Sequence, residues 1–386
     1  MKNKTVLLIL IIMFFTLILP VKAQEENTPA THDNSDYATG RVLNVVSQGQ
    51  NKALQESFGG NQTAQLVKVK ILDGKYKGKI INVQNQLTSS PAYDINVKNG
   101  MRVVLDVEKN GKLSDINISD LDRIPALMII TGLFLSLLLI IGGKRGLKAL
   151  FSLVFTALLI FCGLVPAILN NWPIVPVTIG ISIFATVLLT FIVGGINLKS
   201  ISAIIGTVSS VLIAGIIAMI IIKIAPLTGY TSQEAIMLYT SRPDLNFTGI
   251  LTAGMIIGAL GAIIDIGISI ASSIFEINCV DRCLSPKELI KSGLNVGKDI
   301  MGAMANTLIL AYIGGALPLI LLAANAPIAK LINLNAIAAE ITAALVGSIG
   351  IVLCIPITAV VSGYLMGNKK VIKEEFVDLQ EGSQLN

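Results

Sequence analysis

Five polar side chains lie in long apolar segments of the last third of the chain, and their types suit ion or proton chemistry. They are Asp265, Ser269, Asn306, Thr307 and Glu340. A carboxyl group inside a membrane can bind a proton or a cation, and amide and hydroxyl oxygens can complete such a site. In the alternative, structural interpretation, Asp265 holds helices together by hydrogen bonds and Glu340 is a solvated residue at the membrane edge. The residue types leave both interpretations open.

Asp265 belongs to a stripe of small and polar residues. Gly254, Gly258, Gly261, Asp265 and Ser269 follow one another at intervals of three or four residues, which places them on one face of a helix. Helices with such a face pack closely against other membrane helices. We therefore expect glycines to mark helix contacts, namely Gly254, Gly258, Gly261, Gly302, Gly347 and Gly350.

The candidate residues fall at similar depths in the expected bilayer. At about 1.5 Å per residue, Asn306 lies about 10 Å beyond Asp299, and Tyr312 lies about 20 Å beyond it. The preceding segment runs antiparallel to this one and contains both Asp265 and Glu276, which are about 16 Å apart. Measured from the same side of the bilayer, Asp265 is therefore expected at a depth between Asn306 and Tyr312. The sequence thus predicts a polar seam between the last three apolar segments.

Composition places the chain among membrane proteins and leaves little material for enzyme chemistry. Hydrophobic residues make up 53% and charged residues 14% of the chain, which has one histidine and four cysteines. Cys279 and Cys283 are one helical turn apart, but the sequence near them offers no third and fourth metal ligand. No nucleophile–base pair or phosphate-binding loop is recognisable. We expect no enzyme activity, no catalytic residue, no metal and no cofactor.

Seven apolar segments are each close to the roughly 20 residues that cross a bilayer. They cover residues 125–141, 147–169, 174–194, 200–222, 249–275, 300–323 and 336–366. The expected fold is an all-α polytopic membrane bundle of about seven transmembrane helices within residues 125–366.

Basic residues orient this bundle. If the N-terminal domain is outside, the inward connections hold eleven Lys and Arg residues and the outward connections hold three. The inward set is Lys144, Arg145, Lys148, Lys199, Arg282, Lys287, Lys291, Lys298, Lys369, Lys370 and Lys373, and the outward set is Lys223, Arg242 and Lys330. Because basic residues concentrate in cytoplasmic loops, we expect an external N-terminal domain and a cytoplasmic tail at 367–386. The same loops account for the net charge of +5, so nucleic-acid binding is not expected.

Three parts precede the apolar segments. Residues 1–23 have the charged start, apolar centre and small-residue end of a signal peptide, with an uncleaved anchor helix as the alternative. Residues 24–36 form a polar linker. Residues 37–120 contain short alternating runs separated by Gly, Asn and Asp, which predict a small extracytoplasmic β-barrel of the OB or SH3-like type. Such a domain could bind peptides or oligomers, or it could be a rigid spacer.

Three phrases resemble the YibE/F family of bacterial multi-pass membrane proteins. They are GALGAIIDIGISIASSIFEI at 258–277, SGLNVGKDIMGAMANTLILAYIGGALPLIL at 292–321 and AAEITAALVGSIGIVLCIPITAV at 338–360. The resemblance also covers GKYKGKIINVQN at 74–85, and it implies a protein of the bacterial cell membrane that is of the transporter or permease kind. It maps the shared positions of the family onto Asp265, Ser269, Asn295, Asp299, Gly302, Asn306, Thr307, Glu340, Gly347, Gly350 and Pro356. Relatives often carry a basic residue shortly after the glutamate, where this chain has Thr342, Ala343 and Ala344.

Two functions from different classes are compatible with these observations. The first is ion-coupled transport of an unknown solute through the seam between the last three helices. The second is a non-transporting accessory role in envelope or protein-export processes, which a fainter likeness to SecD/SecF-type export proteins also suggests. The expected partners are the lipid bilayer, the unknown solute or ion and, for the second function, other membrane or envelope proteins.

Overall fold

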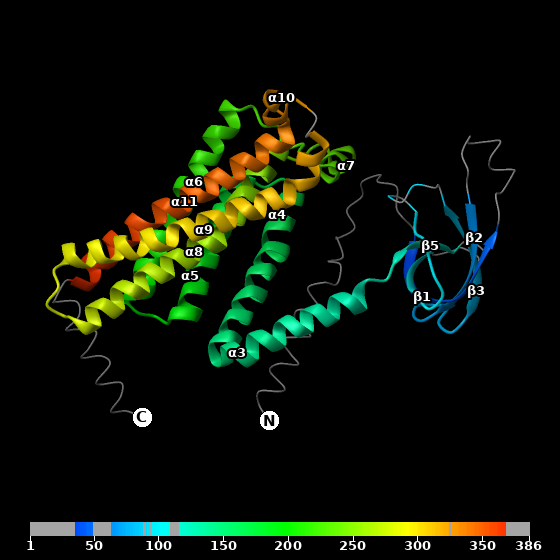
Figure 1. The fold of residues 1–386 in the computed structure, drawn as a ribbon, viewed down its shortest axis with the longest axis horizontal. Helices are drawn as coiled ribbons and strands as arrows, with labels where there is room; N and C mark the ends of the chain where they lie inside the picture. Colours follow the sequence, from blue (N-terminus) through cyan, green and yellow to red (C-terminus); the bar gives the residue numbers. More distant parts are fainter. Residues whose placement is uncertain are drawn as a thin grey trace. The chain divides into compact units, whose positions relative to one another are not determined.

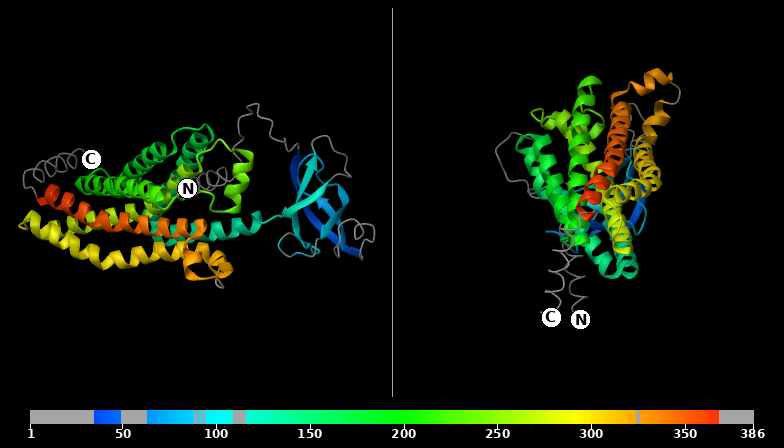
Figure 2. Two further views of the ribbon diagram at one scale, coloured as in Figure 1. Left: turned by 90° about the horizontal axis from the view of Figure 1, so that it is seen from above. Right: turned by 90° about the vertical axis from the view of Figure 1, so that its left-hand side faces the viewer.

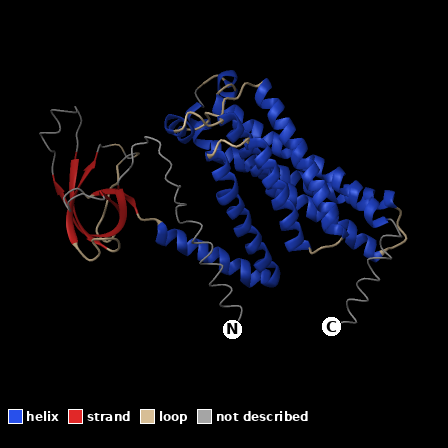
Figure 3. Ribbon diagram, turned by 180° about the vertical axis from the view of Figure 1, so that it is seen from behind, coloured by secondary structure: helices blue, strands red, loops and turns tan. Residues whose placement is uncertain are grey.

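The structure is a computed structural model that describes residues 35–48, 63–87, 90, 92, 94–108, 116–323 and 326–367. It divides into two compact units, the first ending at Ile141 and the second beginning at Gly142. The described strands all belong to the first unit (Figure 3). The expected signal peptide, most of the expected linker and the tail after Gly367 lie outside the described residues.

The N-terminal unit contains a five-stranded antiparallel sheet (Figure 1). Its strands are β1 Ser35–Gln48, β2 Thr63–Ile71, β3 Ile80–Leu87, β4 Arg102–Glu108 and β5 Asn117–Leu121, in the spatial order β3-β2-β1-β4-β5. Along β2, Val67 and Val69 are fully buried while Lys68 and Lys70 are exposed, so the sheet has one apolar face. The two end strands approach one another, which curls the sheet into half a barrel. A β-sheet unit is thus confirmed, and the OB or SH3-like assignment remains an expectation.

The second unit is a bundle of long helices, and the helix that leads into it is broken. This helix, α3, is Ile124–Leu159, but Gly143 has φ 51° and ψ −127°, values outside the helical region. The remaining elements are the π-helical η2 Ile160–Leu164, α4 Val165–Leu169, α5 Ile174–Gly194, α6 Leu198–Ile224, α7 Gln233–Ser241, α8 Phe247–Val280, α9 Pro286–Ala323, α10 Ile328–Ile332 and α11 Asn335–Gly367.

Six segments of the described chain are long and apolar enough to cross a membrane, where the sequence predicts about seven. The first, Ile124–Leu169, has 46 residues, which is roughly 70 Å of helix and more than twice the hydrocarbon thickness of a bilayer. It contains both segments predicted at 125–141 and 147–169. The counts differ because helical structure resumes directly after Gly143 instead of passing into a loop.

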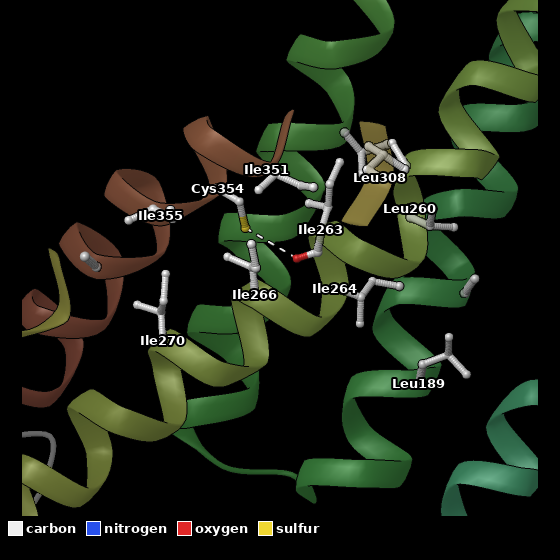
Figure 4. Close-up of a cluster of buried hydrophobic side chains, with 14 of the residues drawn as sticks. Leu189, Leu260, Ile263, Ile264, Ile266, Ile270, Leu308, Ile351, Cys354 and Ile355 are labelled. Atoms are coloured by element: carbon white, nitrogen blue, oxygen red, sulfur yellow. Dashed lines mark hydrogen bonds between the residues drawn. The ribbon is translucent and has the colours of Figure 1, made fainter. Parts of the chain in front are cut away.

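The centre of the bundle is formed by α11, which lies against α6, α8 and α9. Figure 2 shows α11 running alongside α9. The shared core contains Ile263, Ile266 and Ile270 of α8 with Ile351 and Cys354 of α11, all at most 1% exposed (Figure 4). The core between the facing helices is thus made mainly of branched aliphatic side chains.

Glycines set the distance between the central helices. A Cβ on Gly206 of α6 would overlap the side chain of Thr358 on α11, and a Cβ on Gly267 of α8 would overlap Thr207 on α6. Such close backbone approach is the usual role of small residues in membrane bundles, where van der Waals packing holds the helices together.

Candidate functional site

The stripe that carries Asp265 lies on the outer face of the described bundle. Gly254, Gly258, Gly261, Asp265 and Ser269 are all exposed, whereas the opposite face of α8 forms the core. The sequence predicts a packed face here, and the structure differs because periodicity identifies a face without identifying what covers it. In a bilayer, this face would meet lipid, another protein or a water-filled path.

Asp265 itself has no hydrogen bond or ion pair among the residues that the structure describes. It lies 18 residues after the start of α8 and 15 before its end, about 27 Å and 22 Å along the axis. A carboxylate in the middle of a membrane-spanning helix is costly unless it is paired, hydrated or protonated. The structural interpretation requires a hydrogen-bond partner for Asp265, and none of the described residues is one.

The α9 residues of the predicted seam are exposed as well. Thr307 donates its hydroxyl hydrogen to the carbonyl oxygen of Ala303, 2.8 Å away in the preceding turn. Asn306 is exposed beside it. In the part of the chain that the structure describes, no hydrogen bond or ion pair joins either residue to Asp265. Among the described residues, these side chains thus do not form one closed site, and their common depth stays a prediction.

Tyr312 is the residue that connects the three helices of the seam. Its hydroxyl oxygen on α9 lies 2.5 Å from the position that a Cβ on Gly258 of α8 would take. Tyr312 is also close enough to Glu340 of α11 for an electrostatic interaction. Glu340 is partly buried rather than fully solvated. Tyr312 is not among the site residues predicted from the sequence, because an aromatic residue on an apolar helix is usually a packing residue.

The six glycines expected at helix contacts divide into two groups. A Cβ on Gly347 would lie 2.5 Å from Leu308 of α9, one on Gly350 would lie 2.8 Å from Ile263 of α8, and Gly258 meets Tyr312. The other three have nothing within 4 Å of that position, and they are Gly254, Gly261 and Gly302. The open glycines lie on the exposed faces of α8 and α9, where they leave space instead of making contacts.

A second polar region, missed from the sequence, is buried in the bundle. Thr178, Ser182, Thr186 and Thr190 repeat every four residues along α5 and are at most 1% exposed. Thr178 and Thr186 donate to carbonyl oxygens one turn earlier, whereas the hydroxyl oxygens of Ser182 and Thr190 have no hydrogen-bond partner among the described residues. The spacing of four residues between hydroxyl side chains in an apolar segment could have revealed this region from the sequence.

Hydroxyl groups also surround Cys354 where α6, α8 and α11 meet. The thiol sulfur lies 3.5 Å from the carbonyl oxygen of Ile263 and 3.5 Å from the hydroxyl of Thr358. Thr207 and Ser210 of α6 are close to the same sulfur. These groups are neutral, so the region can hydrogen-bond or solvate an ion but supplies no carboxylate.

Charged pairs gather outside the membrane-spanning segments. Asp244, in the connection from α7 to α8, accepts hydrogen bonds from Arg242 at 3.0 Å and from Asn171 at 2.7 Å. The guanidinium of Arg242 and the amide of Asn171 hold the pKa of the Asp244 carboxyl well below its ordinary value. This cluster fastens the turn after α4 to the start of α8. Among the described residues, no group of three or more His, Cys, Asp or Glu side chains could hold a metal ion.

Together, the apolar helices and the N-terminal sheet define a multi-pass membrane protein with a β domain. A family model described as YibE/F-like protein matches residues 130–368, and one described as YibE/F family N-terminal domain matches residues 33–121. The chain belongs to the YibE/F family. No curated protein matches it. No solved structure matches it either.

Proposed function

We propose that the protein is an ion-coupled transporter of a solute, with Asp265 as the residue that binds the coupling proton or cation. The observation that carries this proposal is a carboxyl group without a partner among the described residues, halfway along a helix long and apolar enough to cross a membrane. Such a group has a small free-energy cost when protonated and a large one when charged, so proton binding and release can drive a change of state. No enzyme activity is part of the proposal.

The faces of α8 and α9 support a path for the solute. Around Asp265, the α8 stripe is made of glycine and serine, and α9 presents Gly302, Asn306 and Thr307 on its own exposed face. Small residues leave room for a solute, and the amide and hydroxyl groups can replace its water. The contact of Tyr312 with Gly258 lies next to this path, where a bulky side chain can close it.

The test is proton flux in liposomes that contain the full chain, measured with a trapped pH dye after an acid pulse. Asp265→Asn keeps the shape of the side chain and removes its titration, so we expect it to lose at least nine-tenths of the flux. The matched control is Ser273→Ala, which removes a hydroxyl that only donates to the Ser269 carbonyl at 2.9 Å and should keep the flux. Equal flux from wild type and Asp265→Asn would refute the coupling role.

We further propose seven spans with the N-terminal domain outside the cytoplasm and the C-terminus inside. The support is the break at Gly143, which divides a 46-residue segment between two bilayer lengths, and the excess of basic residues in the inward connections. A reporter inserted after Lys144 should be cytoplasmic, and one inserted after Asn171 should be external. The opposite labelling at either position, or external labelling at both, would overturn this topology.

A second candidate function is a non-transporting accessory factor for envelope or export processes. The observation in its favour is the same exposed stripe, because a face of small residues is also suited to packing against a helix of another membrane protein. In that case Asp265→Asn would retain function, which is the opposite of the result expected for transport. A bulky residue at Gly261 would abolish function in both cases, so the Asp265 variant is the one that distinguishes them.

A further inference from the structure

The exposed face of the N-terminal sheet carries a row of basic residues across three strands. Arg41 of β1 is paired with Lys70 of β2 on one side and with Arg102 of β4 on the other. Residues directly opposite each other in antiparallel strands point to the same face, so the three side chains stand side by side. All three are exposed. Two strand spacings separate the outer members, which is about 10 Å.

This arrangement is unfavourable for the sheet alone. Like charges that lie directly opposite each other across strands repel. Within the described chain, Arg102 has an ion-pair partner in Asp122, at 3.2 Å, whereas Arg41 and Lys70 have no salt bridge. Lys68, the next outward residue on β2, adds another positive charge and is also exposed. Arg41, Lys70 and Lys68 therefore place positive charges on this face that no salt bridge between described residues neutralises.

The row begins next to the first long apolar helix. Asp122, which pairs with Arg102, accepts a hydrogen bond from the backbone N–H of Ile124, the first residue of α3, at 3.1 Å. The backbone N–H of Asp122 also donates to the carbonyl oxygen of Arg102, at 3.0 Å. The sheet and the first half of α3 belong to one unit. The basic row is thus fastened directly to the start of an apolar helix long enough to span a bilayer.

We propose that Lys70, Arg41 and Arg102 form a binding surface for the phosphate headgroups of anionic phospholipids at the membrane that α3 enters. Lysine and arginine side chains reach several ångströms beyond the backbone and extend toward headgroup phosphates. Anionic lipid attracts basic residues only within about one Debye length, which makes closeness to the membrane entry point decisive. Binding of lipid supplies the counter-charge that the sheet lacks. The proposal is independent of transport and of which side of the membrane the sheet occupies.

The test uses the full-length protein in nanodiscs of phosphatidylcholine, with or without added phosphatidylglycerol. Acetylation rates of individual lysines, read by mass spectrometry, report their contacts. We expect Lys68 and Lys70 to react several-fold more slowly when phosphatidylglycerol is present, and we expect high salt to restore their rates because it screens the attraction. Equal rates in the two nanodiscs would overturn the proposal. Protection that persists in high salt and in pure phosphatidylcholine would overturn it too, because it would indicate burial against protein.

A matched pair of variants separates the row from general charge attraction. Arg41→Gln removes the middle of the row, and Lys75→Gln removes one exposed charge from the turn between β2 and β3. We expect Arg41→Gln to lose most of the protection of Lys68 and Lys70 while the thermal stability of the sheet stays equal or rises, because a like-charge contact is gone. Lys75→Gln should retain the protection. Equal losses in both variants would refute a defined site.

Discussion

Gly206→Ala is expected to destabilise the bundle by about 2 kcal/mol or more, the range found when extra carbon is forced into a packed core. The new methyl group would lie 2.8 Å from the Cβ of Thr358 and 3.0 Å from its Cα, after overlapping its hydroxyl. A side chain can rotate away, but a Cα cannot, so α11 must move relative to α6. The measurement is the thermal unfolding midpoint of the purified full chain in one detergent.

Gly314→Ala is the matched control, since it makes the same chemical change at an open position of α9. Among the described residues, no tertiary contact lies within 4 Å of the position that a Cβ would take at Gly314. Because alanine favours a helix over glycine by about 1 kcal/mol, the control should leave the midpoint unchanged or raise it. Midpoints that fall equally in both variants would show that glycine flexibility, rather than close helix approach, is what the bundle needs.

Gly229→Ala, in the connection between α6 and α7, is expected to have a comparably large effect. Gly229 has φ +83°, and a Cβ there would overlap the carbonyl oxygen of Phe247, the first residue of α8. The variant therefore adds a backbone clash to the roughly 1–2 kcal/mol that an ordinary residue loses in this conformation. The ring of Phe247 also lies against those of Tyr230, in a tilted arrangement, and Tyr239, edge-on, at ring-centroid distances of 5.0 and 5.8 Å. In the variant, the near-ultraviolet circular dichroism signal of these aromatic rings should decrease, and the unfolding midpoint should decrease with it.

Gly195→Ala isolates the backbone conformation from the clash. Gly195 has φ +76°, and the nearest atom to its Cβ position is Nδ2 of Asn197, at an ordinary 3.7 Å. Gly195 also has ψ 175°, a region that is essentially restricted to glycine, so its own conformational cost is about 1–3 kcal/mol. This variant should lose only that part, so we expect it to be more stable than Gly229→Ala. An equal loss in the two variants would contradict the argued contact with Phe247.

The sequence was most informative where apolar runs are long. The membrane helices and the strand-forming region near 37–120 follow from periodicity and length, because burial in lipid or in one sheet face constrains most residues of each element. The first two segments are the exception. The stretch Gly142–Gly143 followed by Lys144 and Arg145 predicts a loop, whereas the structure has a single-residue break with helix on both sides. Both a loop and a single-residue break are compatible with two consecutive glycines, because glycine adopts many backbone conformations.

The candidate site shows a different limit. The spacing of the small residues predicted the stripe on α8. It could not predict that the stripe is exposed, because small residues occur both at helix contacts and on uncovered faces. Gly350 lies against Ile263, and Gly261 lies against nothing within 4 Å, although both are glycines at helical spacing. Neighbours distant in sequence decide the difference. The buried hydroxyl residues of α5 were overlooked for a related reason, because serine and threonine can bond within their own helix and need no partner in the pattern.

The break at Gly143 has a mechanical consequence. An intact helix transmits torque and axial load, because each turn is hydrogen-bonded to the next. At Gly143 the backbone adopts a positive φ that glycine tolerates without strain, and no tertiary contact from the described residues lies within 4 Å of the position that a Cβ would take. The chain passes from the N-terminal unit to the bundle next to this residue. A pull or twist on the N-terminal unit is thus transmitted to the bundle less completely than it would be through an unbroken helix.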